Sequence, residues 1–292
     1  MAVSIHLGAH KTASTHLQYS LRLGREALRA KGVFLAEPSM LRDAGAIPLE
    51  QALAEGEGSA AQDLCRQQLD RLRGAAPDLL LSEENILGGT RRGTLFSRRG
   101  LVYPFAARRL RQTIAMAGGG PVVLYLALRD PADFQVSAFS LQVLLGNELE
   151  LAPYLQGRDP VRVGWSGLVR RLAAVEGVAR IVVWRYEDYP VLRPRLLDLM
   201  LPEGVAATLP DPPRSNESLT QPGYDWMLRR AMADSEADLR DLARRARRRF
   251  RRGDGHPPLR LLDEATRIRS ARAYAAEIAR IRTLVGVTLL EP

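Results

Sequence analysis

The sequence is poor in cysteine, in aromatic residues and in long apolar runs. Its single cysteine, Cys65, cannot form an internal disulfide, so nothing in the chain of 292 residues indicates an oxidising compartment. Aromatic residues make up 6% of the chain and do not alternate with arginines, which argues against a base-stacking surface and against a nucleic-acid partner. The longest apolar run, residues 122–128, is far shorter than the ~20 residues that span a bilayer. No secretory signal pattern precedes the first predicted strand, so we expect a soluble cytoplasmic protein without a membrane span.

Lysine is almost absent although the chain is basic. Of 42 basic residues only Lys11 and Lys31 are lysines, and the formal net charge is +9. A charge of this sign favours polyanionic partners such as a nucleotide or an acidic glycan. Much of the excess lies in residues 244–252, which predict the solvated face of a late helix, with a polyanion-binding surface as the alternative.

Short apolar runs alternate with longer amphipathic patterns along roughly the first 205 residues. This alternation predicts an α/β fold with a central, mainly parallel sheet flanked by helices on both faces. The predicted strands are residues 3–7, 33–35, 79–82, 122–128 and 181–184. After a proline cluster at residues 210–213, the pattern is helical from residue 222 to the end. We therefore expect an α/β domain over residues 1–220 and a helical C-terminal segment over residues 221–292 packed on it.

Polar residues follow four of the predicted strands directly. They are residues 8–15, 82–85, 129–131 and 185–188. Ligands of open parallel sheets bind beyond the carboxyl ends of the strands. We therefore expect these four segments to meet at one site.

The loop after the first predicted strand, residues 8–14, is typical of an anion-binding turn. Successive backbone N–H groups, a helix N-terminus, several hydroxyls and the ammonium of Lys11 converge there. The loop is not a standard nucleoside-triphosphate loop, because that pattern needs two glycines with the lysine directly after the second. Here the single Gly8 precedes the lysine by three residues. A plain strand-to-helix turn capped by Ser14 or Thr15 is the structural alternative.

The segment after the fourth predicted strand is the second strong signal. Asp130 is suited to cap a helix whose first residue is Pro131. Arg129 at the strand end and Ser137 two turns into that helix could hold one phosphate, the guanidinium supplying a charge-assisted fork. Alternatively, Arg129 forms an ordinary salt bridge and Ser137 is a helix serine without a binding role.

Together the two segments resemble the sulfotransferase family, which transfers sulfuryl groups from 3′-phosphoadenosine 5′-phosphosulfate (PAPS). Residues 8–18 are similar to the family's 5′-phosphosulfate loop, and Arg129 with Ser137 eight residues later is similar to its 3′-phosphate motif. Ala13 stands where the family usually has glycine, and Ser14 stands where it has threonine. Further segments resemble the bacterial, carbohydrate-type branch, and the resemblance covers roughly residues 1–220. These segments are residues 32–34, 79–84, 183–187 and 214–219.

The resemblance implies a fold like that of P-loop nucleotide-binding proteins and a site that needs no metal. Lys11 then stabilises charge on the bridging oxygen of PAPS, and Arg129 and Ser137 hold its 3′-phosphate. The residues that hold the 5′-phosphosulfate are Gly8, Lys11, Thr12, Ala13, Ser14 and Thr15. Residues 214–218 are expected to close over the cofactor.

An acceptor hydroxyl or amine also needs a base within hydrogen-bond reach. We favour Glu84, which belongs to a Ser-x-Glu pattern beginning at Ser82, with Glu83 and His10 as alternatives. A helix capped by Ser82, with both carboxylates in its first turn, is the structural alternative. Glu187 follows a strand too, and we expect it to anchor a helix.

The sequence thus predicts a PAPS-dependent sulfotransferase acting on a hydroxyl or amine acceptor, with 3′-phosphoadenosine 5′-phosphate (PAP) as the second product. A glycan or a small hydroxylated molecule is the expected acceptor, and the oligomeric state stays open. One alternative is a nucleotide-dependent kinase of related fold. The other is a non-catalytic protein that binds polyanions.

Overall fold

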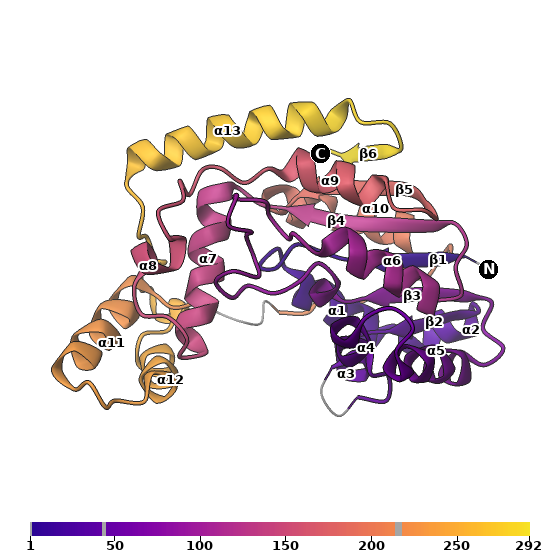
Figure 1. Ribbon diagram of the computed structural model, residues 1–292, viewed down its shortest axis with the longest axis horizontal. Helices are drawn as coiled ribbons and strands as arrows, with labels where there is room; N and C mark the ends of the chain where they lie inside the picture. The colour runs from indigo at the N-terminus through magenta and orange to yellow at the C-terminus, as the bar shows by residue number, and fades with distance from the viewer. Residues whose placement is uncertain (1, 43–44, 214–217) are drawn as a thin grey trace.

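A computed structural model describes residues 2–42, 45–213 and 218–292, and it has a single six-stranded sheet (Figure 1). The strand order is β2-β3-β1-β4-β5-β6 and every neighbouring pair is parallel. The strands are β1 (Val3–His6), β2 (Val33–Ala36), β3 (Asp78–Ser82), β4 (Val122–Leu128), β5 (Val178–Arg185) and β6 (Val287–Leu290). The predicted α/β class with a parallel central sheet is confirmed.

Helices cover both faces of this sheet, because the central strands are apolar on both sides. In β4, Leu124 and Leu126 face one hydrophobic cluster, whereas Tyr125 and Ala127 face the other. One face is covered by α1 (Ser14–Leu23), α2 (Arg25–Ala30) and α10 (Tyr189–Met200). The other cluster includes residues of α4 (Leu49–Glu55), α5 (Ala60–Arg73), α6 (Ala106–Met116), α7 (Pro131–Leu144), α9 (Trp165–Ala173), α11 (Gln221–Ala233), α12 (Leu239–Arg249) and α13 (Glu264–Arg282).

Short elements complete the connections between these helices and strands. Two are the α-helices α3 (Pro38–Leu41) and α8 (Leu151–Leu155). Four are 3₁₀ turns: η1 (Glu84–Ile86), η2 (Tyr186–Asp188), η3 (Ala206–Thr208) and η4 (Arg252–Asp254). Among the residues that the structure describes, no helix is long and apolar enough to cross a membrane.

The start of α7 is as the sequence predicts. Pro131 is its first residue, where the missing N–H of proline costs no hydrogen bond. The Asp130 carboxylate accepts from the N–H groups of Ala132, at 3.0 Å, and of Asp133. This cap fixes the helix directly after the strand end that carries Arg129.

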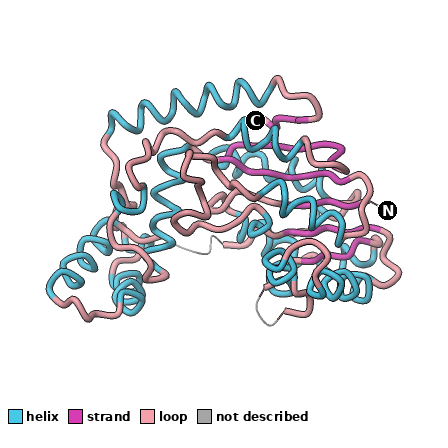
Figure 2. The backbone as a smooth tube through the Cα atoms, viewed as in Figure 1, coloured by secondary structure: helices cyan, strands magenta, loops and turns pink. Residues whose placement is uncertain are grey.

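The C-terminal segment is not entirely helical, and the expectation that helix continues to the end is wrong for residues 287–290. These residues form β6, which pairs with β5 at the edge of the sheet (Figure 2). The strand was missed because it is only four residues long and its apolar run is no stronger than that of a helix turn. The division of the chain into domains at residue 220 stays a prediction.

Candidate active site

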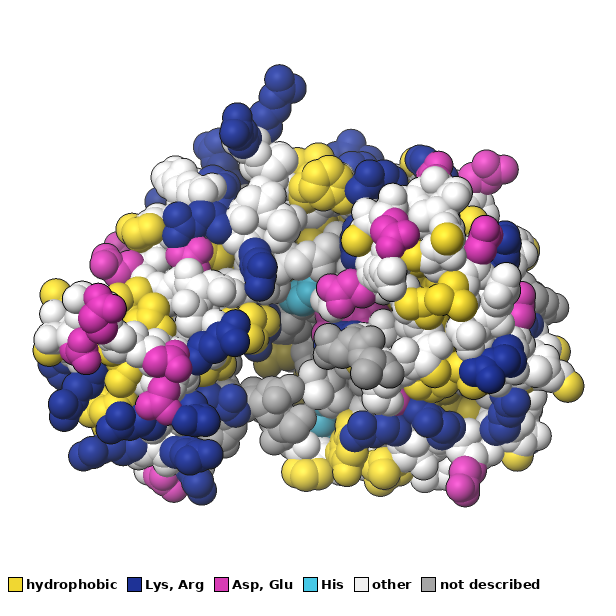
Figure 3. All heavy atoms as spheres, turned by 60° about the horizontal axis from the view of Figure 1, so that its bottom comes forward, with side chains coloured by type: hydrophobic (Ala, Val, Ile, Leu, Met, Phe, Trp, Pro, Cys, Tyr) yellow, Lys and Arg dark blue, Asp and Glu magenta, His cyan; other side chains and the backbone are white. Residues whose placement is uncertain are grey.

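The carboxyl ends of the strands meet at one place, as expected. The loop after β1 contacts the end of β3 through His10 Nε2 and Asn85 Oδ1, which lie 3.1 Å apart. Arg129 after β4 donates to the Lys11 carbonyl at 2.9 Å, and the Asp130 N–H donates to Glu187 after β5 at 2.9 Å. Figure 3 shows the surface hollowed beside the α11–α12 side of the molecule, with histidine and carboxylate side chains in the hollow.

The loop between β1 and α1 has an unusual backbone. Gly8, Lys11 and Ala13 all have positive φ, at 46°, 66° and 65°. At Gly8 a Cβ would lie 2.4 Å from Ser14 Oγ, so a side chain there would displace the Ser14 hydroxyl. The N-cap of α1 is Ala13, and no side chain caps the helix, so a turn capped by Ser14 or Thr15 is not what the structure has.

The consequence is a row of unused hydrogen-bond donors. Within the described residues, none of the backbone N–H groups of residues 11–15 has an acceptor. The hydroxyl of Ser14 is buried there without a partner as well. Donors left over at a helix N-terminus are groups that can bind an anion, and a buried hydroxyl without a partner is uncommon in folded proteins. The Thr12 hydroxyl, in contrast, donates to the Ala9 carbonyl at 2.5 Å and braces the loop from within.

Lys11 extends from this row with no ion pair to any described residue. Burial lowers the pKa of its ammonium, and the nearby positive charges of Arg129 and Arg247 lower it further, while Glu84 acts in the opposite direction. A cation that is partly desolvated and lies among other cations is an effective partner for a ligand anion.

Part of the Arg129 guanidinium is held by contacts within the protein. Its Nη1 holds the Lys11 carbonyl, and the group lies 4.5 Å from the centre of the Tyr186 ring. Its Nε is buried without a partner among the described residues. Ser137, on α7, is 8% exposed, and its hydroxyl makes no hydrogen bond in the described part of the chain. No hydrogen bond joins Arg129 and Ser137 to each other.

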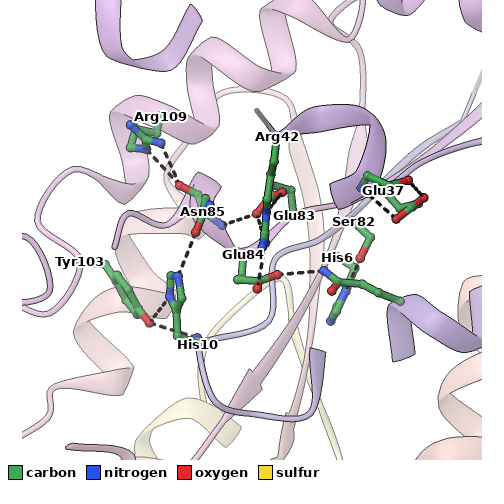
Figure 4. Close-up of polar contacts among 12 residues, drawn as sticks. His6, His10, Glu37, Arg42, Ser82, Glu83, Glu84, Asn85, Tyr103 and Arg109 are labelled. Atoms are coloured by element: carbon green, nitrogen blue, oxygen red, sulfur yellow. Dashed lines mark hydrogen bonds and ion pairs between the residues drawn. The ribbon is translucent and has the colours of Figure 1, made fainter. Parts of the chain in front are cut away.

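Two carboxylates at the end of β3 share one arginine (Figure 4). Arg42 donates to both oxygens of Glu83, at 2.6 and 2.7 Å, and its Nη2 lies 2.9 Å from Glu84 Oε1. Gln18 donates to the other oxygen of Glu84 at 2.8 Å. Burial acts to raise the pKa of Glu84, but the charge of Arg42 and the hydrogen bonds prevail and lower it to about 2. Glu84 is therefore ionised, held on both oxygens and 13% exposed.

Glu83, which the sequence leaves as an alternative base, has a structural role. Its side chain is 3% exposed, and besides Arg42 it accepts from the Asn85 N–H at 2.8 Å. It is the N-cap of η1, so the structural alternative of a helix capped by Ser82 is wrong. Ser82 ends β3 and instead lies 2.7 Å from His6 Nδ1.

His10, the third candidate base, uses both ring nitrogens. Nδ1 lies 2.9 Å from the Tyr103 hydroxyl and Nε2 lies 3.1 Å from Asn85 Oδ1 (Figure 4). Since Asn85 Oδ1 can only accept, Nε2 carries the proton and Nδ1 accepts from Tyr103. Burial lowers the pKa of His10, which keeps the ring neutral in this network.

Glu187 anchors two elements, as expected. Its carboxylate accepts from the Asp130 N–H at 2.9 Å and from the Tyr274 hydroxyl on α13 at 3.3 Å. The segment expected to close over the cofactor lies outside the described residues from 214 to 217. Among the described residues, no group of three or more His, Cys, Asp or Glu side chains is arranged to hold a metal ion.

Sequence reasoning missed three residues of this site, namely Arg42, Asn85 and Tyr103. Arg42 and Tyr103 lie in loops that belong to no recognisable motif, and each reaches a partner far away in the chain. Asn85 directly follows the paired glutamates and was included in the strand-end segment without a role. Gln18 belongs to the segment that resembles the phosphosulfate loop, so a signal for it was present.

No protein family and no curated protein matches this chain. Among solved structures, the chain is similar to a sulfotransferase from Alicyclobacillus acidocaldarius, with 14% identity and a TM-score of 0.43 over 84% of this chain and 96% of that one. It is also similar to retinol dehydratase, solved with androsterone and the inactive cofactor PAP, with 12% identity and a TM-score of 0.36 over 100% of this chain and 82% of that one. The first of these structures is a sulfotransferase, and the likeness concerns the fold alone.

Proposed function

We propose that this chain is a PAPS-dependent sulfotransferase that transfers the sulfuryl group to a hydroxyl or amine acceptor. The observation that supports it most is the loop of residues 8–15, where backbone N–H groups and the Ser14 hydroxyl have no protein acceptor beside an unpaired Lys11. Such a set fits a tetrahedral anion at the N-terminus of α1.

The residues present fit both ends of the cofactor. The N–H groups of residues 11–15 with the Ser14 and Thr15 hydroxyls hold the 5′-phosphosulfate, which supplies the activated sulfuryl group. Arg129, through its unpartnered Nε, and Ser137 hold the 3′-phosphate. Arg129 also donates to the Lys11 carbonyl. Binding of the 3′-phosphate by Arg129 therefore also stabilises the loop that holds the 5′-phosphosulfate.

Lys11 has the charge and position to stabilise the oxygen that leaves. Sulfuryl transfer, like phosphoryl transfer, depends on in-line positioning and on stabilising charge at the leaving oxygen. An ammonium next to backbone donors in a partly buried loop supplies that stabilisation without moving during the reaction.

Glu84 is the proposed proton acceptor. Each of its oxygens holds one hydrogen bond, from Arg42 or Gln18, and keeps a lone pair for an acceptor hydroxyl. A carboxylate with a low pKa is a weak base, yet a loose transition state releases the acceptor proton late and requires little basicity. Glu83 is less accessible than Glu84, at 3% exposed, and holds two hydrogen bonds on Oε1 and one on Oε2. The one acceptor nitrogen of His10 is occupied by Tyr103.

The two lysines of the chain offer a matched test. PAP binding is measured by calorimetry, and transfer is measured with labelled donor against a panel of hydroxylated acceptors. Lys11→Ala is expected to lower the transfer rate by roughly 10²–10³-fold, whereas Lys31→Ala leaves both binding and transfer unchanged.

The other hypotheses predict different results in the same assays. Magnesium-dependent ATP binding without PAP binding would support the kinase. Binding of polyanions with no nucleotide binding would support the non-catalytic protein. If Lys11→Ala and Lys31→Ala behave alike, Lys11 has no part in the reaction.

A further inference from the structure

The backbone around Lys11 is fixed by two side chains that come from other parts of the chain. On one side, Arg129 donates to the Lys11 carbonyl at 2.9 Å. On the other side, the N–H of His10 donates to the hydroxyl of Tyr103 at 3.1 Å. Lys11 has a φ of 66°, which a lysine adopts only where the surrounding structure holds it. The two contacts therefore determine where the Lys11 side chain begins.

The hydroxyl of Tyr103 makes two hydrogen bonds, and both are to His10. It accepts from the His10 N–H, and it lies 2.9 Å from His10 Nδ1, to which it donates its single proton (Figure 4). Burial raises the pKa of Tyr103, which keeps that proton on the hydroxyl. One group thus fixes both the backbone and the ring of the residue directly before Lys11.

The other ring nitrogen of His10 is held as well. Nε2 donates to Asn85 Oδ1 at 3.1 Å, and the Asn85 carbonyl in turn accepts from Arg109 of α6 at 2.9 Å. The His10 ring also stacks on the Tyr103 ring, with their centres 5.7 Å apart. His10 therefore cannot turn without breaking contacts to two separate segments of the chain.

Tyr103 is itself held in a disfavoured backbone conformation, with a φ of 45°. Among the described residues, only three other non-glycine residues have positive φ, and two of them are Lys11 and Ala13. The Tyr103 carbonyl accepts from Arg171 of α9 at 3.0 Å, and its N–H donates to the Leu95 carbonyl at 2.8 Å. Such strain costs roughly 1–3 kcal/mol and persists where the surroundings over-determine it, often at functional sites.

We propose that Tyr103 is a positioning residue, whose hydroxyl sets the position of the Lys11 ammonium through His10. The inference rests on the proposed sulfotransferase function, in which that ammonium stabilises the leaving oxygen. Tyr103 is 0% exposed, so it acts through the loop and does not touch a substrate. Position matters here, because a misplacement of about 1 Å in an active site can lower the rate roughly 100-fold.

The test removes one hydroxyl group. Y103F eliminates both hydrogen bonds to His10 and keeps the aromatic ring. The matched control is Y154F, on α8, because Tyr154 is buried too and its hydroxyl donates to the Thr90 carbonyl at 2.9 Å. Urea unfolding establishes that both variants are folded.

The first measurement needs no substrate. The chain has two lysines, so isotope labelling of lysine Cε resolves Lys11 from the exposed Lys31 by NMR. Burial lowers the pKa of Lys11, and neighbouring cations lower it further. We expect Y103F to raise the pKa of Lys11 toward its ordinary value, because a loosened loop lets the ammonium become hydrated. The Lys31 signal should stay unchanged, and Y154F should shift neither signal.

The second measurement follows transfer of the sulfuryl group from labelled PAPS to water, which requires no known acceptor. Y103F should lower the rate by roughly tenfold, whereas Y154F should leave it unchanged. PAP affinity, measured by calorimetry, should fall less than the rate, because Lys11 acts on charge that develops in the transition state. The double variant K11A/Y103F should be as slow as K11A, because Tyr103 acts only through Lys11.

Three results would overturn the inference. They are an unshifted Lys11 signal in folded Y103F, a wild-type rate in Y103F, and losses of rate that multiply in the double variant. If Y103F does not fold, R171Q takes its place in the NMR measurement, since it frees the Tyr103 carbonyl and leaves the hydroxyl present. An unshifted Lys11 signal in R171Q then overturns the inference equally.

The proposed function fails by different results. Failure of the wild-type chain to bind PAP would contradict it, and so would a wild-type rate in K11A. The Lys11 signal is recorded without nucleotide, so it reports on the contact between Tyr103 and the loop in either case.

Discussion

At the scale of single residues, the loop of residues 8–14 owes its shape to side chains held in backbone conformations that they disfavour. Lys11 and Ala13 both have φ near +65°, in the left-handed region. There a Cβ approaches the following carbonyl oxygen, at a cost of roughly 1–2 kcal/mol. The cost is offset only by contacts of the folded chain, such as the hydrogen bond from Arg129 to the Lys11 carbonyl.

Ala13→Gly should therefore stabilise the protein. Glycine lowers the free energy of unfolding by roughly 0.4–1 kcal/mol, because it gives the unfolded chain more conformational freedom. The backbone strain that glycine relieves at this position is larger. We expect a gain of up to about 1 kcal/mol in the free energy of unfolding, measured with urea. Ala9→Gly, in the same loop at a buried position without positive φ, should instead destabilise. Equal losses in both variants would show that Ala13 is not strained.

Buried histidines make the stability depend on pH. Burial lowers the pKa of His6 to about 4, with Glu84 acting against it, and burial lowers that of His10 too. An unfolded histidine has a pKa of about 6.5. As the pH falls, the unfolded chain takes up protons before the folded one does. The free energy of unfolding is therefore highest above about pH 6.5 and decreases as the pH drops toward 4.

His6→Gln should reduce this acid sensitivity. The lowered pKa of His6 reduces the free energy of unfolding by at most roughly 3 kcal/mol between pH 7 and pH 4. Urea unfolding at both pH values measures the difference, and His256→Gln, in the loop after η4, is the control. If the His6 variant loses as much free energy of unfolding between the two pH values as the wild type does, other groups cause the acid sensitivity.

At the scale of elements, the end of β3 is fixed by a residue from another part of the chain. Arg42, directly after α3, joins that helix to the 3₁₀ turn η1 through Glu83 and Glu84. The pair Arg25 and Glu37 makes a similar contact next to α3, at 2.6 Å, but away from the proposed base. The first contact sets the charge state of the site, whereas the second holds the fold.

Arg42→Gln should raise the pKa of Glu84 from about 2, because burial then acts without the opposing charge. The ionised form, which accepts the proton in the proposed reaction, would be lost at a higher pH. We expect the acid limb of kcat/KM to move up by a unit or more, while circular dichroism reports whether the variant is folded.

Two further variants separate charge from structure at this site. Arg42→Lys keeps the charge and should leave the acid limb near its wild-type position. Arg25→Gln should lower stability without moving the limb. An unchanged limb in a folded Arg42→Gln variant would exclude Glu84 as the proton acceptor.

At the scale of the whole molecule, the C-terminal segment is part of the central sheet and core. The strand β6 pairs with β5, and Tyr274, Ile278 and Ile281 of α13 belong to the main hydrophobic cluster. Ser270 of the same helix donates to Asp130 at 2.7 Å. The cap of α7, and with it the position of Arg129, therefore depends on residues near the end of the chain.

Leu290→Ala should destabilise the protein by about 2–3 kcal/mol, since it removes a buried side chain from the edge strand. Leu290 is 1% exposed, whereas Val285 in the preceding turn is 96% exposed. Val285→Ala is therefore the control and should change the free energy of unfolding by less than about 0.5 kcal/mol. Similar small effects for both variants would show that β6 adds little to the fold.

Sequence reasoning succeeded where the signal was local. The five predicted strands follow from apolar runs, and the Asp130–Pro131 start of α7 follows from two neighbouring residues with known helix-terminal preferences. That the strand ends would meet follows from the geometry of any parallel sheet. The residues that sequence reasoning missed contact partners far along the chain. Tyr103, for example, contacts His10, which lies 93 residues away.

The sequence by itself therefore determined a parallel α/β sheet and a strand-to-helix loop with Lys11 at its carboxyl edge, because period, spacing and helix-terminal preference act over a few residues. Tertiary structure alone decided that the oxygens of Glu84 keep lone pairs while the acceptor nitrogen of His10 is occupied, since Arg42, Gln18, Tyr103 and Asn85 reach these two residues from separate elements. It also decided that Ala13 takes a conformation suited to glycine, because the contacts holding that loop are made only in the folded chain.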